Sequence, residues 1–167
     1  MLEPDGRMTV FLLFGLLAVL SALLAWIDIR DGIIPDWINL AIAALGFANA
    51  LLIGGSSAGL EALGEGAVVG IVFWLLRRVY FSLRKVQGLG LGDVKFLAAA
   101  GLWVGVAGVP VLLLIATITA LVCAGLMQLA GRSLTRQTSM SFGPFLAVGL
   151  LFAYGFQQSW FCCALIP

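Results

Sequence analysis

The sequence predicts an all-α, polytopic membrane protein with about six transmembrane helices. Hydrophobic residues make up 62% of its 167 residues and charged residues only 10%, and the apolar residues fall into runs long enough to be spans. The mean hydropathy of +1.14 exceeds that of a soluble domain, whose surface needs more charge. Since little polar sequence remains outside these runs, we expect residues 1–167 to form a single membrane-embedded domain.

Charge and composition exclude several kinds of function. The net charge of +1 provides no broad basic face, so nucleic acid is not expected as a partner. Histidine is absent, and the three cysteines (Cys123, Cys162 and Cys163) lack the C-x-x-C spacing of zinc ligands. We therefore expect no metal, no cofactor and no histidine-dependent triad. Carboxylates remain as the candidate catalytic groups.

Glycine, proline and charged residues divide the apolar runs into spans of about 20 residues. The first run follows Glu3 and Asp5, which argue against the basic start of a signal peptide, so we expect a retained span. Breaks are predicted at the Gly-Gly pair at 54–55 and at the Gly-Val-Pro sequence at 108–110, because proline clashes inside a helix. The predicted spans are 8–27, 37–53, 60–80, 94–107, 111–130 and 142–157.

Basic residues predict how the spans are oriented. Eight of the nine fall in or beside alternate loops, and only Arg7 falls on the other side. Positive charge concentrates in cytoplasmic loops, so we expect a multi-pass protein of the inner (plasma) membrane with these loops in the cytoplasm. The eight residues are Arg30, Arg77, Arg78, Arg84, Lys85, Lys95, Arg132 and Arg136.

Small and amide side chains predict contacts between spans. Asn39 and Asn49 fall inside the second span, where each is expected to hydrogen-bond to a neighbouring helix. Glycines four residues apart allow helix backbones to approach closely in lipid. These glycines are Gly66 and Gly70, and Gly101 and Gly105.

Most of the acidic residues have a structural explanation. Glu61 and Glu65 begin the third span, where an interfacial position accounts for them and an ion or substrate contact is the alternative. Asp31 is expected in solvent beside Arg30. Asp36 precedes the second span and is predicted to cap its N-terminus.

Asp28 and Asp93 differ from these residues. Asp28 ends the first span and Asp93 begins the fourth, so the predicted topology puts both at the same depth on the cytoplasmic side. Two carboxyl groups in one site do not both ionise readily, so one keeps a proton while the other acts as a base. Such a pair can activate water for attack on a peptide carbonyl. Charge placement alone leaves helix capping or interface anchoring equally open.

Three segments resemble motifs of the type IV prepilin peptidases, which are intramembrane aspartyl proteases of the GxGD type. Residues 28–36 (DIRDGIIPD) resemble the first aspartate motif of that family, and residues 88–95 (GLGLGDVK) resemble the second, Gly-x-Gly-Asp-x-Lys. Residues 141–145 (SFGPF) resemble a C-terminal Gly-Pro-Phe element, in which Gly143 and Pro144 are expected to serve packing or a bend. In this order, the motifs cover nearly the whole chain.

The resemblance implies roles for particular residues. Asp28 and Asp93 would be the catalytic aspartates, and Gly90 and Gly92 would shape the site beside them. Lys95 matches a motif position whose role the resemblance does not assign, so a part in the site and a cationic anchor at the interface both stay open.

The same resemblance implies the substrates, which would be prepilins or the pseudopilins of type II secretion. These carry a short basic leader on the cytoplasmic side, cleaved after a glycine, and then a hydrophobic helix. Many bacterial members also have a zinc-binding insertion with paired C-x-x-C motifs, associated with N-methylation. Here the first span leads directly into the first aspartate motif and those cysteines are absent, so the chain resembles a short, peptidase-only form. S-adenosylmethionine is therefore not expected.

Three other interpretations stay open. A transporter or channel subunit would depend most on Glu65, Asn39 and Asn49, which lie deepest in the spans. A non-catalytic assembly protein would tolerate alanine at Asp28 or Asp93. A presenilin-like protease also uses a Gly-x-Gly-Asp motif, but those proteins have more spans and a first aspartate deeper in a helix.

Overall fold

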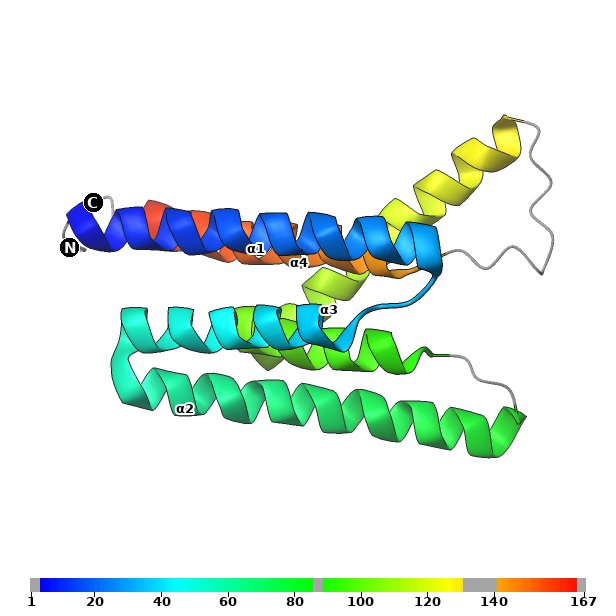
Figure 1. The fold of residues 1–167 in the computed structure, drawn as a ribbon, viewed down its shortest axis with the longest axis horizontal. Coiled ribbons are helices and arrows are strands. Elements are labelled where there is room, and N and C mark those ends of the chain that lie inside the picture. Colours follow the sequence, from blue (N-terminus) through cyan, green and yellow to red (C-terminus); the bar gives the residue numbers. More distant parts are fainter. Residues whose placement is uncertain (1–3, 86–88, 131–140, 165–167) are drawn as a thin grey trace.

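Four helices make up the described part of the chain (Figure 1). The computed structural model describes residues 4–85, 89–130 and 141–164, and within these ranges it contains no strand. The helices are α1 (Pro4–Asp31), α2 (Asp36–Arg84), α3 (Leu91–Leu129) and α4 (Gly143–Ala164). The predicted all-α class is confirmed.

Two glycines divide the long helices. Gly55 in α2 (φ 73°, ψ −165°) and Gly105 in α3 (φ 69°, ψ 174°) have positive φ values, which residues with a Cβ atom rarely adopt. At Gly55 the helix α2 doubles back on itself, and at Gly105 the helix α3 turns (Figure 1). The described residues therefore form six straight segments, which are α1, 36–54 and 56–84 of α2, 91–104 and 106–129 of α3, and α4.

The break in α3 falls earlier than the sequence predicted. The prediction at 108–110 is wrong, because Pro110 lies inside the helix shortly after the break at Gly105. Proline is tolerated near the start of a helix, whereas a positive φ favours glycine. The Val104 carbonyl, next to the break, accepts a hydrogen bond of 2.9 Å from the Gln157 side chain. The predicted break at 54–55 is confirmed.

Three helices in the described part of the chain are long and apolar enough to cross a membrane. They are Met8–Asp31 of α1, α2 and α3, with hydropathies of 2.7, 1.8 and 2.5. Large apolar side chains also point outward from the bundle, including Leu12, Leu40 and Leu121, each more than two thirds exposed. An apolar exterior of this kind suits lipid as the surrounding solvent.

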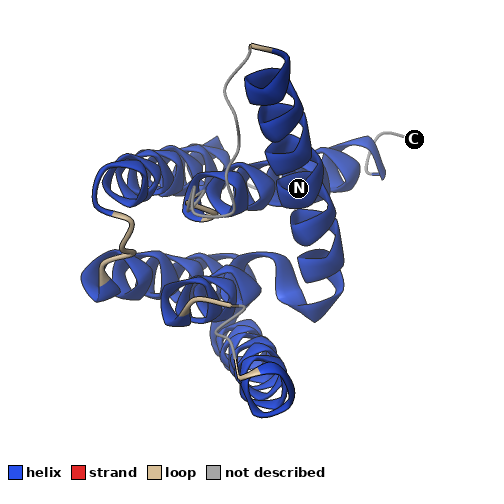
Figure 2. Ribbon diagram, turned by 90° about the vertical axis from the view of Figure 1, so that its right-hand side faces the viewer, coloured by secondary structure: helices blue, strands red, loops and turns tan. Residues whose placement is uncertain are grey.

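The segments stack in layers (Figures 1 and 2). Helix α1 lies beside α4, segments 36–54 and 91–104 form the next layer, and segment 56–84 lies outermost. Segment 106–129 crosses from the middle layer to α4 and extends beyond the bundle. The core between the layers contains the fully buried side chains of Leu17, Ile42, Phe96, Leu112 and Leu150.

Glycines allow α2 and α3 to approach closely. A Cβ atom at Gly101 would lie 3.0 Å from the Cα atom of Gly66, and one at Gly70 would lie 3.0 Å from the Cβ atom of Ala98. The predicted role in helix contact is confirmed for these three glycines. Gly105, the fourth, instead forms the break in α3.

The two asparagines of segment 36–54 have different surroundings. Asn49 Oδ1 accepts a hydrogen bond from the Tyr154 hydroxyl of α4 at 3.3 Å, as predicted. Asn39 is only 5% exposed, but neither its amide nitrogen nor its amide oxygen has a hydrogen-bond partner among the described residues. The predicted interhelical hydrogen bond of Asn39 is therefore wrong.

Candidate active site

Asp28 lies in the last turn of α1 and is 5% exposed. Gly32 follows the end of this helix with a φ of +66°, and its amide donates a hydrogen bond to the Asp28 carbonyl at 2.9 Å. This is the usual geometry of a helix that stops at a left-handed glycine. Because the helix stops there, the carboxyl group of Asp28 lies at the end of the bundle.

The start of α4 holds Asp28 from another side. The Gly143 amide donates to Asp28 Oδ2 at 2.8 Å, and the Ser141 hydroxyl donates to the Asp28 backbone carbonyl at 2.7 Å. A Cβ atom at Gly143 would overlap the Asp28 carboxyl group, so this approach requires glycine. The sequence predicts packing or a bend at Gly143, and neither of these contacts was predicted from it. The Ser-Phe-Gly-Pro-Phe motif was the available signal.

Asp93 lies in the first turn of α3, which begins after Gly90. A Cβ atom at Gly90 would lie 3.0 Å from Asp93 Oδ2. One at Gly92 would lie 3.0 Å from the Cβ atom of Ile34, in the connection between α1 and α2. Larger residues would therefore crowd either the carboxyl group or the packing of α3 against this connection.

The structure brings Asp28 and Asp93 to one cavity. This cavity of about 690 Å³ lies where α1 ends and where α3 and the segment leading into α4 begin. The side chains of both aspartates line it. The cavity is also lined by Gly90, Gly92, Lys95, Asp36, Ser141 and Phe142. All five residues singled out from the sequence, Asp28, Asp93, Gly90, Gly92 and Lys95, thus line the same cavity.

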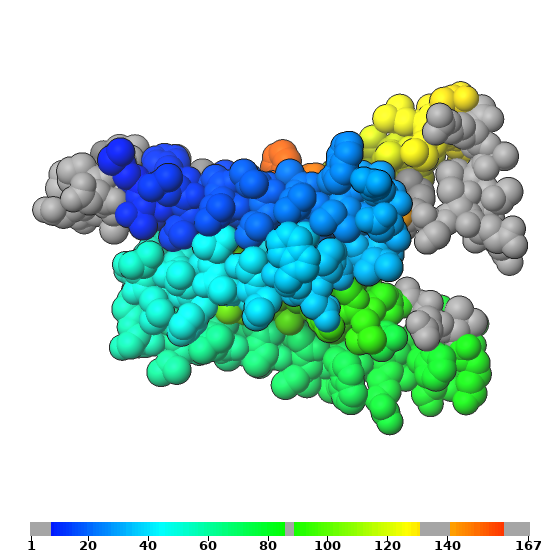
Figure 3. Space-filling view, in the orientation of Figure 1, coloured from blue at the N-terminus to red at the C-terminus, as the bar shows by residue number. Residues whose placement is uncertain are grey.

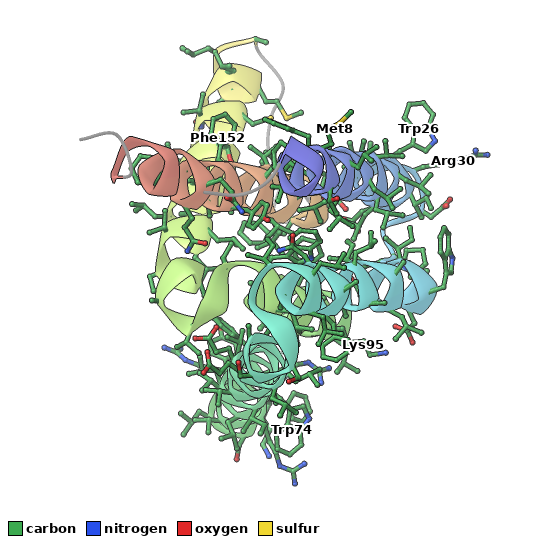
Figure 4. All side chains as sticks on the ribbon, turned by 90° about the vertical axis from the view of Figure 1, so that its left-hand side faces the viewer. Met8, Trp26, Arg30, Trp74, Lys95 and Phe152 are labelled. Carbon is green, nitrogen blue, oxygen red and sulfur yellow. The ribbon has the colours of Figure 1, made fainter. Side chains whose placement is uncertain are left out.

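Lys95 and Asp36 form an ion pair in the wall of this cavity. Lys95 Nζ lies 2.7 Å from each carboxylate oxygen of Asp36, and both side chains are substantially exposed. The prediction that Asp36 caps α2 is wrong, because the cap residue is Pro35 and no side chain bonds the free amides. The carboxylate pairs with the lysine instead, since the ammonium group carries a full positive charge and a backbone N–H only a partial one. Figure 4 shows Lys95 between the two segments of α2.

Other polar side chains lie away from the cavity. Glu65 lies beside the break in α3, where a Cβ atom at Gly105 would be 2.6 Å from Glu65 Oε2. Asn49 bonds to Tyr154, whose hydroxyl also accepts from Gln158 Nε2 at 2.8 Å. None of these side chains lines the cavity of the two aspartates.

Two carboxyl groups in one cavity define what this site can do chemically. They can share a proton, so that one acts as an acid and the other as a base toward a molecule between them. Among the described residues, no group of three or more His, Cys, Asp or Glu side chains could hold a metal ion. The side chains of Cys162 and Cys163 lie outside the described residues.

The fold and the cavity define a class of protein: an apolar helical bundle with two aspartates at one end. Comparison with known families agrees with this class. The sequence model of the type IV leader peptidase family matches residues 15–125. The chain belongs to this family of aspartic-type peptidases.

Curated relatives are similar along most of the chain. A protein of Burkholderia pseudomallei (strain K96243) is 36% identical over 137 residues, which are 81% of this chain and 43% of the relative. A protein of Escherichia coli (strain K12) is 35% identical over 151 residues, 88% of this chain and 62% of its own length. Both are named prepilin leader peptidase/N-methyltransferase. The chain thus spans about half the length of the relatives it matches. No solved structure matches it.

Proposed function

We propose that the chain is a membrane aspartyl endopeptidase that removes the short basic leader from prepilins or pseudopilins. The observation that carries the proposal is that Asp28 and Asp93 line one cavity in a chain of the leader peptidase family. The relatives' name, prepilin leader peptidase, indicates the substrate class. N-methylation is not part of the proposal, because residues 1–167 contain no C-x-x-C motif.

In this proposal Asp28 and Asp93 are the catalytic residues. One carboxylate takes a proton from a water molecule, which attacks the carbonyl carbon of the scissile peptide bond. The other carboxyl group, which carries a proton, donates it to the carbonyl oxygen or to the departing amine. Sharing one proton avoids two adjacent negative charges in the cavity. The reaction needs no cofactor.

Three further residues act on the site indirectly, because they fix where Asp93 and the start of α3 lie. Gly90 and Gly92 are site-shaping, because a Cβ atom at either would crowd Asp93 or Ile34. Lys95 is a positioning residue, two residues after Asp93, and it ties the start of α3 to the start of α2 through Asp36.

We further propose that the six straight segments cross the inner membrane, with the aspartate cavity at the cytoplasmic side. The breaks at Gly55 and Gly105 reverse or turn the chain, so the end of α1 and the starts of α3 and α4 lie at one end of the bundle. Basic residues also gather toward this end, including Arg30 and Lys95. A leader in the cytoplasm would reach the cavity while the hydrophobic part of the substrate stays in the lipid bilayer.

Cleavage of a co-expressed prepilin tests the proposed reaction. Wild type, Asp28→Ala and Asp93→Ala are compared by a mobility shift of the size of the leader. We expect processing by the wild type and by neither variant. If membrane-inserted wild type processes none of a panel of prepilins, the proposed reaction is wrong, and if an alanine variant processes one, the catalytic pair is wrong.

A further inference from the structure

A groove on the outside of the bundle adjoins the cavity of the two aspartates. It lies between the two segments of α2, with segment 91–104 of α3 behind it, and has a volume of about 540 Å³. In Figure 3, part of α3 is visible between the two segments of α2. Its walls are mostly apolar and include Leu40, Ala43, Leu63 and Leu102. Leu40 is 71% exposed and Leu63 is 44% exposed, so the groove opens outward.

The groove and the cavity share a border. Asp36 and Lys95 line both of them. On one side of this ion pair lie the carboxyl groups of Asp28 and Asp93, and on the other side lie apolar side chains. The charged lining therefore ends at the Lys95–Asp36 pair, and beyond it the lining is apolar apart from Asn39.

Asn39 places an amide in the wall of this apolar groove. It follows Asp36 by three residues in α2, so the two side chains lie on the same face of the helix. Both polar atoms of the Asn39 amide are buried without a hydrogen-bond partner among the described residues. Buried polar groups nearly always have a partner, so this exception calls for an explanation. A side-chain amide has both a donor and an acceptor, as a peptide group does.

We propose that this groove binds the hydrophobic segment of the prepilin substrate, and that the Asn39 amide pairs with the substrate backbone next to the cleaved bond. The inference rests on the proposed function. A substrate of this class changes from a basic leader to an apolar helix at the cleaved bond, much as the charged lining ends at the Lys95–Asp36 pair. Because the Asn39 amide is covered, the entering substrate displaces a neighbouring side chain.

The chemistry of cleavage explains why an amide would be needed there. A peptide bond must leave the helical conformation to be attacked, which frees backbone N–H and C=O groups of the substrate. In apolar surroundings such groups are strongly unfavourable without a hydrogen-bond partner. Asn39 offers one donor and one acceptor beside the cavity, whereas the other groove residues away from the ion pair are apolar.

Photocrosslinking tests where the substrate lies. The probe is a synthetic peptide with a basic leader ending in glycine and then an apolar segment, reconstituted in vesicles with the full chain carrying Asp93→Asn. A photoreactive benzoylphenylalanine replaces Leu40 or Leu63 in the groove, or Leu12 of α1, which is exposed to a similar extent as Leu40. We expect adducts with the peptide at Leu40 and Leu63 that excess unlabelled peptide abolishes, and none at Leu12.

The same experiment separates this inference from the proposed function. Wild type is assayed for cleavage of the same peptide in the same vesicles. Cleavage without peptide adducts in the groove, or with adducts only to lipid or to a second copy, overturns the groove and leaves the function standing. Failure of the wild type to cleave overturns both.

Replacing the amide tests Asn39 itself. Asn39→Leu keeps the number of side-chain heavy atoms and the branch at Cγ, and we expect kcat/KM to fall about tenfold while the melting temperature stays equal or rises, because an unpaired buried amide is removed. The matched control, Asn49→Leu, loses a hydrogen bond to Tyr154 and should lower the melting temperature with little change in kcat/KM. A lower melting temperature and unchanged kcat/KM for Asn39→Leu would overturn the assignment.

Discussion

The two halves of the bundle use their polar side chains differently. At one end, Asp28 and Asp93 face a cavity and Lys95 stands in its wall. In the other half, Asn49 bonds to Tyr154, and Gln157 bonds to the carbonyl exposed by the break in α3. The first arrangement leaves the two aspartate carboxyl groups facing a cavity open to another molecule, and the second pairs uncharged polar side chains within the protein.

This difference bears on the competing interpretations. A transporter or channel would depend most on Glu65, Asn39 and Asn49. Asn49 is paired within the protein, and Glu65 lies beside the break at Gly105, away from the aspartate cavity. Asn39 is the exception, and it lines a groove that borders the aspartate cavity. The comparison therefore favours function at the aspartate end, and four changes test it.

The largest effect is expected from removing either charge in the cavity. Asp28→Asn and Asp93→Asn each remove a group that transfers a proton, so we expect cleavage of a prepilin to fall by about 10²–10⁴-fold. Membrane insertion should be unchanged. The control is Asp31→Asn, a side chain that is 57% exposed beside Arg30 and should keep near-normal turnover. Near-normal turnover of either of these two variants would show that Asp28 and Asp93 are not the catalytic pair.

A change at Gly143 should have the next largest effect. Gly143→Ala places a Cβ atom against the Asp28 carboxyl group and displaces it, and we expect turnover to fall by about 100-fold, as small misplacements of catalytic groups do. Gly15→Ala in α1 is the matched control, because its Cβ atom meets nothing within 4 Å. Steady-state kinetics and thermal melting are measured for both. Equal activity of the two variants would show that the contact of α4 with Asp28 does not matter.

Lys95 should have a smaller effect. Its ion pair with Asp36 is partly exposed, and such pairs contribute about 0–1 kcal/mol, so Lys95→Gln should lower kcat/KM by no more than about tenfold. Lys95→Arg, which keeps the charge, should be milder. A severe loss of kcat in Lys95→Arg would show that the lysine takes part in the chemistry instead of positioning α3.

The smallest effect is expected in the other half of the bundle. Glu65→Gln should leave cleavage within about twofold of wild type, as for most exposed side chains without a special role. Cleavage and ion flux are both measured in vesicles. A large change in flux with normal cleavage would favour the transporter interpretation instead.

The amino-acid sequence alone predicted the all-α class and the break at 54–55, and the resemblance of its motifs implied that Asp28 and Asp93 share one site. These features depend on local properties: the length of apolar runs, a glycine that permits positive φ, and short motifs at the ends of spans. The basic residues also predict how the spans are oriented, because positively charged loops stay on the cytoplasmic side of the membrane. Local information was sufficient for the class and the break, whereas the orientation stays a prediction.

The packing of the helices, in contrast, fixes which side chains far apart in the sequence meet. The contact of Gly143 with Asp28 joins residues 115 positions apart, and the ion pair of Lys95 with Asp36 joins residues 59 apart. It also decided that α3 breaks at Gly105, where Gln157 of α4 bonds to the Val104 carbonyl. Such partners depend on how the helices pack, and local propensity along the chain does not specify that packing.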